Sequence, residues 1–376
     1  MSDVKIKVCH IISDVDHSHL IEAIERFLNK KKYEVSFILL GRKCPALFHI
    51  FQKRGCQTYF IEYRNRYNLI LSIRHLCQIF SHLQPDIVHT HLVNASLAGL
   101  IAAKISGIKH RVHTRHHSVE CHNYHPHGVY YDKLISRLST KIVAISRVVF
   151  DVLTKRENVN SDKIELIRHG FDFNEFKADP ESSAEIKKKY DLTENFPIVG
   201  VISRFVEWKG VQYIIPSFAR LLEIYPQAKL VLANANGPYA PKIKKMLAEY
   251  LSESQYILIP FEKKIFDLYA SFDIFVHVPV DKESEAFGQI YVEALAMNIP
   301  AIFTLSGVAD DFIKDKINAL TVEYKNSNAI FEAMRELVEN DKLRQKIIEK
   351  GRSDVFELFQ AQKMADKLDV LYTSII

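Results

Sequence analysis

Features of several protein classes are missing from this chain of 376 residues. The five cysteines are scattered and form no C-x-x-C pair, so we expect a reducing compartment rather than a disulfide framework. No run of about 18 apolar residues occurs, and the first residues, MSDVKIKVCHII, lack the charged-then-apolar layout of a signal peptide. No low-complexity tract or short-period repeat is present. Together these absences predict a globular cytoplasmic protein without a membrane span.

Positive charge is concentrated in one half of the chain, although the net charge is only +5. Residues 1–190 carry 29 Lys and Arg against 19 Asp and Glu, whereas the remainder carries 21 against 26. A basic domain favours a phosphate-bearing acceptor or an anionic membrane surface. Charges near the ends of helices and strands also serve simply to keep a surface hydrated. Peripheral membrane contact through the first half is therefore an open interpretation, and we expect no nucleic-acid partner.

Apolar runs of strand length alternate with segments of helix length along the first half of the chain. Such runs, separated by helices, are typical of a parallel sheet that is covered by helices on both faces. Helices are expected at residues 19–31, 69–83 and 95–105. The predicted strands are 6–12, 34–40, 58–63, 86–91, 111–114, 142–146 and 164–167. This half therefore predicts one doubly wound α/β domain, which we place at residues 1–172.

The alternation breaks after His169-Gly170-Phe171-Asp172 and then resumes with a polar, lysine-rich helix at 181–190. Predicted strands follow at 198–203, 229–233, 256–259, 273–278, 301–304 and 320–322. The second half therefore predicts another Rossmann-like domain, at residues 173–353. The remaining segment, 354–376, carries apolar positions at helical spacing up to about residue 372 and predicts one long terminal helix.

The most informative stretch of the sequence is 281–300, DKESEAFGQIYVEALAMNIP. Glu285 and Glu293 are eight positions apart, and Gly288 lies between them where a loop is expected to enter a helix. Two carboxylates at this spacing, about 12 Å along a helix, can grip opposite ends of an extended ligand. The glycine leaves room for an anion to approach the free N–H groups at the helix start. This order suits a sugar, a diphosphate and a ribose in a row, and the alternative is an amphipathic helix with an acidic first turn.

Two cations come directly after a predicted strand of the second half. Arg204 follows the strand at 198–203, and Lys209 precedes Gly210 at the start of a helix. Because ligands of open α/β sheets bind beyond the carboxyl ends of the strands, these cations can form a cradle for a diphosphate. In the alternative interpretation, Lys209 caps the preceding loop and Arg204 pairs with Glu207.

Together these residues resemble a known family, because Glu285-Ala-Phe-Gly-Gln-Ile-Tyr-Val-Glu293-Ala-Leu-Ala is similar to the E-x7-E signature of retaining glycosyltransferase family 4. Members have the GT-B fold, in which two Rossmann-like domains face a central cleft and the C-terminal helix crosses back to the first domain. The resemblance implies that Arg204 and Lys209 bind the pyrophosphate of a nucleotide sugar and stabilise the leaving group without a metal. It implies that Glu285 binds the sugar hydroxyls and Glu293 the ribose hydroxyls. Donor-binding positions further include Gly237, Phe287, Gly288 and Gln289.

Parts of the second half depart from the family pattern. Residues 232–238 lie where members usually have a glycine-rich turn, and Ala233 replaces its first glycine, so that Gly237 comes late. Residues 260–262, where members commonly contact the base, also differ. The nucleobase therefore stays open, although a UDP-sugar is the expected donor. Residues 306–309, Ser-Gly-Val-Ala, resemble the family's small-residue turn near the donor phosphates or are only a turn between a strand and a helix.

Sixteen of the 17 histidines precede residue 170, and seven of them lie between His110 and His127. Imidazoles and Cys121 in HRVHTRHHSVECHNYHPH are good zinc ligands, but their spacing matches no familiar ligand pattern, and we expect no metal site. Thr114-Arg115-His116 instead resembles the family's T-x-H, which implies that His116 orients the donor sugar. The alternative is a histidine that only satisfies backbone groups at a strand end.

The loop after the first strand, Ser-Asp-Val-Asp-His-Ser at 13–18, lacks the Gly-Gly turn that many family members have there. Its polar side chains predict that acceptor recognition relies on Asp14, Asp16 or His17. The D-x-D in this loop resembles the manganese motif of the other major glycosyltransferase fold. That fold has a single domain and no E-x7-E, so we expect no manganese site here.

The resemblance, together with these patterns, implies a retaining, metal-independent glycosyltransferase that moves a sugar from a nucleoside-diphosphate sugar to a glycan or lipid-linked acceptor. His116, Arg204, Lys209 and Glu285 are the expected catalytic residues. The resemblance implies bacterial surface-polysaccharide or glycoconjugate biosynthesis, in the cytoplasm or at the inner face of the membrane. It also implies front-face attack, in which the donor phosphate receives the acceptor proton. Alternatives are a nucleotide-sugar epimerase of GT-B fold, a zinc hydrolase built on the histidine cluster, and a non-catalytic nucleotide-sugar binder.

Overall fold

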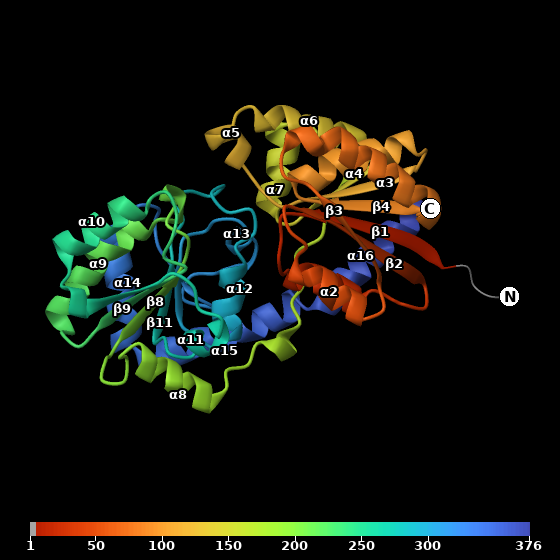
Figure 1. Ribbon diagram of the computed structural model, residues 1–376. Coiled ribbons are helices and arrows are strands. Elements are labelled where there is room, and N and C mark those ends of the chain that lie inside the picture. The colour runs from red at the N-terminus through yellow and green to blue at the C-terminus, as the bar shows by residue number, and fades with distance from the viewer. Residues whose placement is uncertain (1–4) are drawn as a thin grey trace. The chain divides into compact units, whose positions relative to one another are not determined.

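The computed structural model describes residues 5–376, and the chain divides into two compact units. The first unit consists of the described residues up to Phe171 together with Phe359–Ile376, and the second unit is Asp172–Leu358. Each unit is built on one parallel sheet with helices packed around it (Figure 1). The two-domain α/β organisation predicted from the alternating pattern is therefore present.

Seven parallel strands form the sheet of the first unit, in the order β3-β2-β1-β4-β5-β6-β7. Because β1 lies between β2 and β4, the direction of winding reverses between β1 and β4. The strands are β1 (Ile6–Ser13), β2 (Tyr33–Gly41), β3 (Gln57–Glu62), β4 (Ile87–His91), β5 (His110–Arg115), β6 (Lys141–Ala144) and β7 (Ile164–Leu166). The helices are α1 (His19–Phe27), α2 (Ala46–Lys53), α3 (Leu69–Leu83), α4 (Val93–Ile105), α5 (Glu120–Tyr124), α6 (Gly128–Leu138), α7 (Arg147–Asp151) and α16 (Ala361–Ile375).

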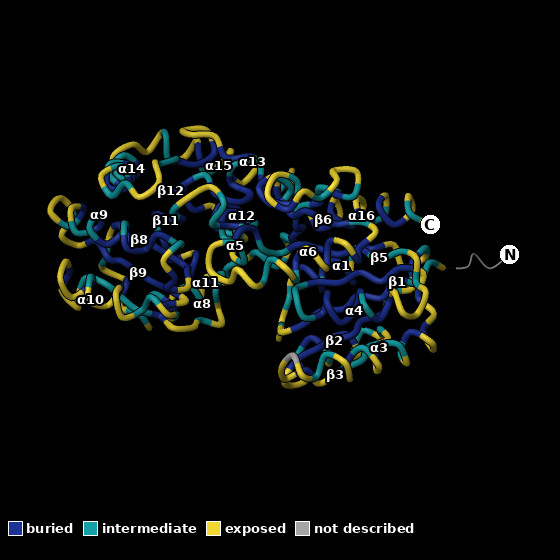
Figure 2. The backbone as a smooth tube through the Cα atoms, turned by 90° about the horizontal axis from the view of Figure 1, so that it is seen from above, coloured by how far each residue is buried: buried dark blue, intermediate teal, exposed yellow. Residues whose placement is uncertain are grey.

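The first sheet is buried on both faces, as β1 illustrates. Val8 and Ile12 belong to one hydrophobic cluster with side chains of α1, α2 and α16. Cys9 and Ile11 point to the opposite face and belong to a second cluster with side chains of α3 and α4. Figure 2 shows the strands of this sheet as buried tubes surrounded by more exposed helices and loops. This two-sided burial explains why the strands appear in the sequence as continuous apolar runs.

Six parallel strands form the sheet of the second unit, in the order β10-β9-β8-β11-β12-β13. Winding reverses between β8 and β11, which are neighbours although β9 and β10 separate them along the chain. The strands are β8 (Ile198–Ile202), β9 (Lys229–Ala233), β10 (Tyr256–Ile259), β11 (Ile274–His277), β12 (Ala301–Phe303) and β13 (Leu320–Thr321). The helices are α8 (Pro180–Lys189), α9 (Val211–Ile224), α10 (Ala240–Tyr250), α11 (Ile265–Tyr269), α12 (Gln289–Ala296), α13 (Ala309–Phe312), α14 (Ser327–Glu339) and α15 (Asp341–Leu358).

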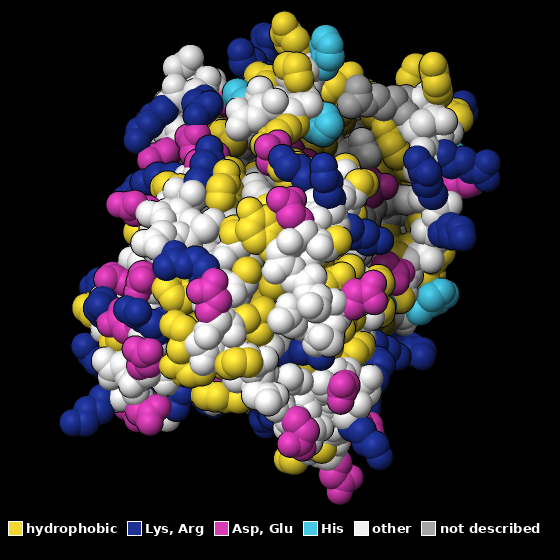
Figure 3. Space-filling model, turned by 90° about the vertical axis from the view of Figure 1, so that its left-hand side faces the viewer, with side chains coloured by type: hydrophobic (Ala, Val, Ile, Leu, Met, Phe, Trp, Pro, Cys, Tyr) yellow, Lys and Arg dark blue, Asp and Glu magenta, His cyan; other side chains and the backbone are white. Residues whose placement is uncertain are grey.

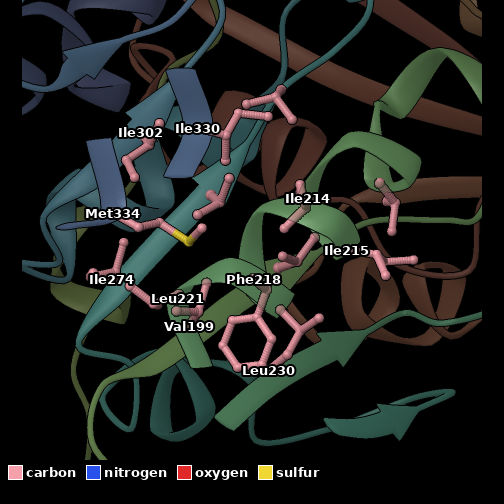
Figure 4. Close-up of a cluster of buried hydrophobic side chains, with 14 of the residues drawn as sticks. Val199, Ile214, Ile215, Phe218, Leu221, Leu230, Ile274, Ile302, Ile330 and Met334 are labelled. Carbon is pink, nitrogen blue, oxygen red and sulfur yellow. The ribbon is translucent and has the colours of Figure 1, made fainter. Parts of the chain in front are cut away.

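One large hydrophobic cluster holds the second unit together. Strand residues such as Val199, Leu230 and Ile274 face Phe218 of α9 and Met334 of α14 (Figure 4). These side chains are fully or almost fully buried, so the strand ends and the loops that follow them are fixed by a rigid core. On the outside, basic and acidic side chains are interspersed over the face of this unit that carries α9 and α10 (Figure 3).

The end of the chain differs from the single long helix expected at 354–376. α15 continues to Leu358, the backbone is extended at Gln360 (φ −61°, ψ 138°), and α16 then begins. The helix is interrupted because Phe171 N donates to Phe359 O (2.8 Å) and Ala361 N donates to Phe171 O (3.0 Å). The apolar positions of the segment are thus divided between two helices, and α16 packs into the core of the first unit.

The first unit also contains helices that the apolar pattern did not predict, namely α2, α5, α6 and α7. α5 has only five residues, Glu-Cys-His-Asn-Tyr, none of which is buried, so it carries no apolar periodicity to detect. In the described part of the chain, no helix combines the length and the apolar character that crossing a bilayer requires.

Candidate functional site

Lys209 lies in the loop that follows β8, at the carboxyl end of the second sheet. Glu207–Lys209 form a single 3-10 turn, which Gly210 ends with a φ of 77°. A Cβ atom at Gly210 would overlap the carbonyl oxygen of Val278, so only glycine lets this loop approach the end of β11. Val280 N donates to Trp208 O (3.0 Å) and closes the contact between the two loops. The sequence Lys-Gly thereby fixes Lys209 beside the segment that contains the first glutamate of the motif.

Glu285 is the centre of a buried polar group in this loop. The Lys209 ammonium donates a hydrogen bond to Glu285 Oε1 and forms an ion pair with it. His277, the last residue of β11, lies with Nε2 3.0 Å from the same oxygen. Because a carboxylate only accepts, we assign the proton of neutral His277 to Nε2. Glu285 N in turn donates to Ser306 Oγ (3.0 Å), which ties the loop after β11 to the loop after β12.

The surroundings keep Glu285 ionised. Burial alone would raise its pKa, but the Lys209 ammonium and the hydrogen bond from His277 outweigh burial and lower the pKa of Glu285 to about 2. Burial lowers the pKa of His277, against the opposing effect of Glu285, so its imidazole is neutral at physiological pH. The site therefore presents one carboxylate with two donors already in place.

The position of this pair in the sheet is informative. Lys209 follows β8 and Glu285 follows β11, and these two strands flank the point where the winding direction reverses. Ligands of open α/β sheets bind in the crevice outside the carboxyl ends of the strands at that point. Two of the predicted catalytic residues are thus brought together at the place where a ligand is expected.

Arg204 and Gly237 lie in adjacent loops of the same edge. Phe205 N donates to Asn236 O (2.7 Å), and Tyr239 N donates to Phe205 O (2.9 Å). Gly237 has a φ of 136°, and a Cβ atom there would lie 2.5 Å from Phe205 O. Glycine is therefore required at position 237 for close packing of the loops after β8 and β9. Its predicted role in donor binding is a separate matter. Arg204, next to this contact, is exposed to solvent.

The predicted donor-binding segment before α12 has mixed exposure. Gly288 is the N-cap of α12 with a φ of 81°, and a Cβ atom there would lie 2.5 Å from the ring of Tyr291. Phe287 is buried and its carbonyl accepts a hydrogen bond from Val308 N (3.0 Å), whereas Gln289 is exposed. Gly307 has a φ of 58° and packs against Glu285, so its turn supports the loop that carries this carboxylate.

Glu293 lies within α12 and is partly exposed. The sequence analysis expected ligand hydroxyls to satisfy its carboxylate. In the structure the hydroxyl of Tyr269, a fully buried residue of α11, already donates to Glu293 Oε2 (2.9 Å). The protein itself therefore orients this carboxylate, and a role toward ribose stays a prediction.

The three predicted acceptor residues lie in the loop after β1 in the first unit. Asp14 has a φ of 57°, and Asn94 Nδ2 donates to its Oδ2 (2.9 Å), which connects this loop to the start of α4. Asp16 Oδ1 accepts from Ala46 N (2.8 Å) at the first residue of α2, and His17 lies 3.5 Å from Asp16. Asp16 thus has a structural role at a helix start, and all three side chains are exposed.

His116 follows β5 and lies within a series of histidines, with His91 and His169 as neighbours. Its Nε2 is 3.1 Å from His91 Nδ1, and His91 Nε2 is 3.1 Å from His10 Nδ1. The loss of water around the rings lowers the pKa of His10 and of His116 to about 3. His116 is therefore a neutral imidazole whose proton position is coupled to that of His91. A neutral His116 can accept or donate one hydrogen bond to a ligand, but it brings no positive charge to the site.

Two residues that complete the second-unit site were missed from the sequence. His277 is the single histidine after residue 170. Its position at the carboxyl end of a predicted strand could have marked it as a candidate site residue. Tyr269 carried no such signal, because its contact with Glu293 depends on how α11 packs against α12.

Comparisons with known proteins identify the family of the chain. Residues 182–354 match the family described as glycosyl transferases group 1, and residues 18–175 match the one described as Glycosyltransferase Family 4. The chain belongs to glycosyltransferase family 4. One relative of this glycosyltransferase is the capsular polysaccharide biosynthesis glycosyltransferase CapM of Staphylococcus aureus, which is 24% identical over 98% of this chain and 97% of its own length.

Solved structures show the fold of this family 4 glycosyltransferase. A glycosyltransferase from Rickettsia africae has a TM-score of 0.80 with 21% identity, and covers 99% of this chain and 98% of its own. The Anabaena protein Alr3699/HepE, solved in complex with UDP and glucose, has a TM-score of 0.84 with 15% identity, and covers 98% of this chain and 100% of its own. The fold is therefore GT-B, with two Rossmann-like units and a C-terminal helix that belongs to the first.

Proposed function

We propose that this glycosyltransferase transfers a sugar from a nucleoside-diphosphate sugar, most simply a UDP-sugar, to a glycan or lipid-linked acceptor with retention of configuration. The observation that carries the proposal is the ion pair of Lys209 and Glu285, completed by His277, where the winding of the second sheet reverses. The similarity to a protein solved with UDP and glucose supports uridine as the base. The relation to a capsular polysaccharide enzyme supports surface-polysaccharide assembly as the setting.

The cations act on the leaving group. In the transfer step the bond between C1 of the sugar and the β-phosphate oxygen breaks, and its electron pair stays on that oxygen. Lys209 and Arg204 lie in the loop after β8 and place positive charge where this negative charge develops. Fixed charges of this kind need no reorganisation during the reaction, and removing one such group costs about 10²–10³-fold in kcat. No metal is then required to hold the diphosphate.

The carboxylates act on the hydroxyls of the donor. Glu285 accepts hydrogen bonds from the transferred sugar, and Glu293 accepts them from the ribose. The acceptor hydroxyl attacks C1 from the face that the diphosphate leaves, and its proton passes to the departing phosphate oxygen, so no protein nucleophile takes part. His116 of the first unit, held neutral, orients the sugar through a single hydrogen bond.

The first unit offers a surface for a lipid-linked acceptor. Tyr67, just before α3, and Ile70, in its first turn, are 93% and 79% exposed, and Tyr130 in α6 is 72% exposed. α3 and α6 both pack against α4 (Figure 1), and Leu69 shares a cluster with Ile135 of α6. Exposed apolar and aromatic side chains on the more basic half of the chain fit the headgroup region of an anionic bilayer. We include peripheral membrane contact in the proposal for this reason.

A two-step experiment tests the proposed function. The full chain is first screened by thermal shift against nucleotide sugars and free nucleoside diphosphates in EDTA. The stabilising donor is then incubated with candidate glycolipids and oligosaccharides, and the products are analysed by mass spectrometry and by NMR of the new anomeric centre. We expect addition of one sugar with the anomeric configuration of the donor. Conversion of the donor without an acceptor would indicate an epimerase, and stabilisation without any product would indicate a binding protein.

A further inference from the structure

Three potential metal ligands converge in the first unit, and none of them has been assigned a role toward the donor. Cys121 Sγ lies 3.7 Å from His117 Nε2, and His117 Nε2 lies 3.0 Å from Asp132 Oδ2 and 3.1 Å from Oδ1. One ligand atom from each of the three residues lies within 4.8 Å of the other two. The sequence pattern did not reveal this group, because Asp132 is 11 positions beyond Cys121 and outside the run of histidines at 110–127.

The local structure holds each of these side chains in place. His117 follows β5, and Cys121 lies four positions later in the first turn of α5. Asp132 comes from α6, is fully buried, and accepts a hydrogen bond from Arg115 Nη2 (3.0 Å). At Gly128, the first residue of α6, a Cβ atom would lie 2.6 Å from Cys121 Sγ. The glycine thus allows the start of α6 to approach the thiol.

Two of the three separations, those from His117 Nε2, are close to the separations of a tetrahedral zinc site. With Zn–S, Zn–N and Zn–O bonds of about 2.3, 2.0 and 2.0 Å, tetrahedral angles place sulfur about 3.5 Å from nitrogen and nitrogen about 3.3 Å from oxygen. The observed distances of 3.7 and 3.0 Å differ from these by only a few tenths of an ångström. A thiol, an imidazole and a carboxylate are also the mixed donor set that suits zinc. We propose that His117, Cys121 and Asp132 bind a zinc ion.

A cavity gives solvent access to this site. Its volume is about 500 Å³, and His117 and Cys121 line it together with Glu120, His125 and His127. An ion can therefore enter from solvent, and a water molecule or a further side chain of the cavity wall can take the fourth position. Binding replaces the thiol proton of Cys121, which leaves to solvent as the zinc–sulfur bond forms. His117 Nε2 faces a carboxylate and so carries a proton, which must move to Nδ1 before the Nε2 lone pair can bind the ion.

The charge of the surroundings favours a cation. Arg115 is fully buried and its Nη2 contacts both Asp132 Oδ2 (3.0 Å) and Glu157 Oε1 (2.7 Å). Two carboxylates thus share one guanidinium. Within the described residues, Arg115 Nη1 and Glu157 Oε2 have no hydrogen-bond partner. A zinc ion with one thiolate adds a single positive charge and brings this buried group to neutrality.

The other histidine group of this unit fits a metal less well. The rings of His89 and His91 stack with centroids 4.5 Å apart and an angle of 24° between their planes, and His10 stacks on His91 at 19°. Imidazole lone pairs lie in the ring plane, so stacked rings do not aim at one ion. Both nitrogens of His89 are also already within hydrogen-bond distance of Tyr372 (2.6 Å) and Thr114 (2.7 Å).

Zinc at this site would connect the end of β5 to α5 and α6. It would thereby stiffen a short, largely exposed helix that begins four positions after His116. The inference does not depend on the transferase assignment, because it rests only on residues of the first unit that have no part in the donor site.

The test uses the full chain stripped of metal by a chelator and then titrated with ZnCl2 against a competing chelator. We expect one zinc per chain in the wild type and a loss of affinity of more than about tenfold in Cys121→Ser, since even indirect partners of a metal contribute about that much. Cys44→Ser, which changes an exposed cysteine elsewhere in the same unit, is the matched control and should bind zinc like the wild type. Equal affinity in Cys121→Ser, or no stoichiometric binding by the wild type, would overturn the proposal.

A spectroscopic measurement covers the case in which Cys121→Ser folds poorly. Co²⁺ bound to the wild-type protein should show the near-ultraviolet charge-transfer absorption of a cobalt–thiolate bond, and alkylation of the cysteines before titration should remove it. Cobalt binding without that absorption would place the ion elsewhere and contradict the assignment of Cys121.

Discussion

Lys209 and Glu285 are 76 positions apart in the sequence, yet their side chains form an ion pair at the carboxyl edge of the second sheet. The pair joins the loops after β8 and β11 where the winding reverses. The Glu285 carboxylate neutralises the Lys209 ammonium. A diphosphate must therefore share this ammonium with Glu285, and this competition leads to the first prediction.

Glu285→Gln keeps the shape of the side chain but removes its charge. We expect the affinity for UDP to stay the same or to rise, because Lys209 is no longer neutralised. Turnover should fall by about 10²–10³-fold, because the transferred sugar loses a charged partner. Calorimetry with UDP and initial rates of transfer measure the two effects separately. Glu249→Gln, an exposed position on α10, should change neither quantity. Parallel loss of UDP affinity and turnover would place Glu285 at the diphosphate instead.

His277→Phe removes a hydrogen-bond donor from the buried Glu285 carboxylate. The loss of a donor to a buried charged group costs about 1–3 kcal/mol, so we expect a lower kcat with a smaller change in the KM of the donor. The acid limb of the rate profile should also move to higher pH, because the pKa of Glu285 rises without this donor. His277→Gln, which can still donate, should recover part of both effects. A loss of stability with an unmoved acid limb would show that His277 is only structural.

The strands and the motif residues could be predicted from the sequence, because both depend on local pattern. Strand-like runs of apolar and β-branched residues located the strands of the described chain to within one or two residues. The signal is clearest where a strand is buried on both faces, as in β1 and β8. The motif around Glu285 and Glu293 and the cations after β8 indicated the donor half of the site. Contacts between residues that are distant in the sequence could not be predicted. The Lys209–Glu285 pair, the Tyr269 hydroxyl on Glu293 and the break at Phe359 each depend on how elements pack.

The acid stability of the first unit should depend on its buried histidines. The pKa of His10 is lowered to about 3, mainly by burial, while the unfolded chain takes up that proton near pH 6.5. The unfolded state thus binds more protons between these values, so this stability is present above pH 6.5 and is lost as the pH falls toward 3. His10→Phe should reduce the slope of the unfolding free energy in this range by about 1.4 kcal/mol per pH unit.

Urea unfolding between pH 4 and pH 7, followed by circular dichroism, checks this expectation. The fluorescence of Trp208, the single tryptophan, reports the second unit separately. Phe51→Leu, in the core of the first unit, should lower stability at every pH and leave the slope unchanged. The same slope in His10→Phe and the wild type would contradict the account.

Membrane contact through the start of α3 can be tested with vesicles. We expect the protein to sediment with phosphatidylglycerol vesicles but not with phosphatidylcholine vesicles, and binding to weaken as salt is added. Ile70→Ser should reduce binding, since it removes an apolar side chain that is 79% exposed. Ile224→Ser, an exposed position of the second unit, is the matched control and should bind like the wild type. Equal binding by both variants would exclude this surface.

The affinity of the wild type and of Lys209→Ala for UDP and for UMP, measured by calorimetry in EDTA, tests the central claim most directly. The cationic cradle predicts that the wild type binds UDP well without a divalent cation and binds UMP much more weakly. It predicts that Lys209→Ala loses most of this preference, whereas Lys245→Ala on the exposed side of α10 keeps it. UDP binding that requires a divalent cation, or a preference for UDP that survives in Lys209→Ala, would contradict the account.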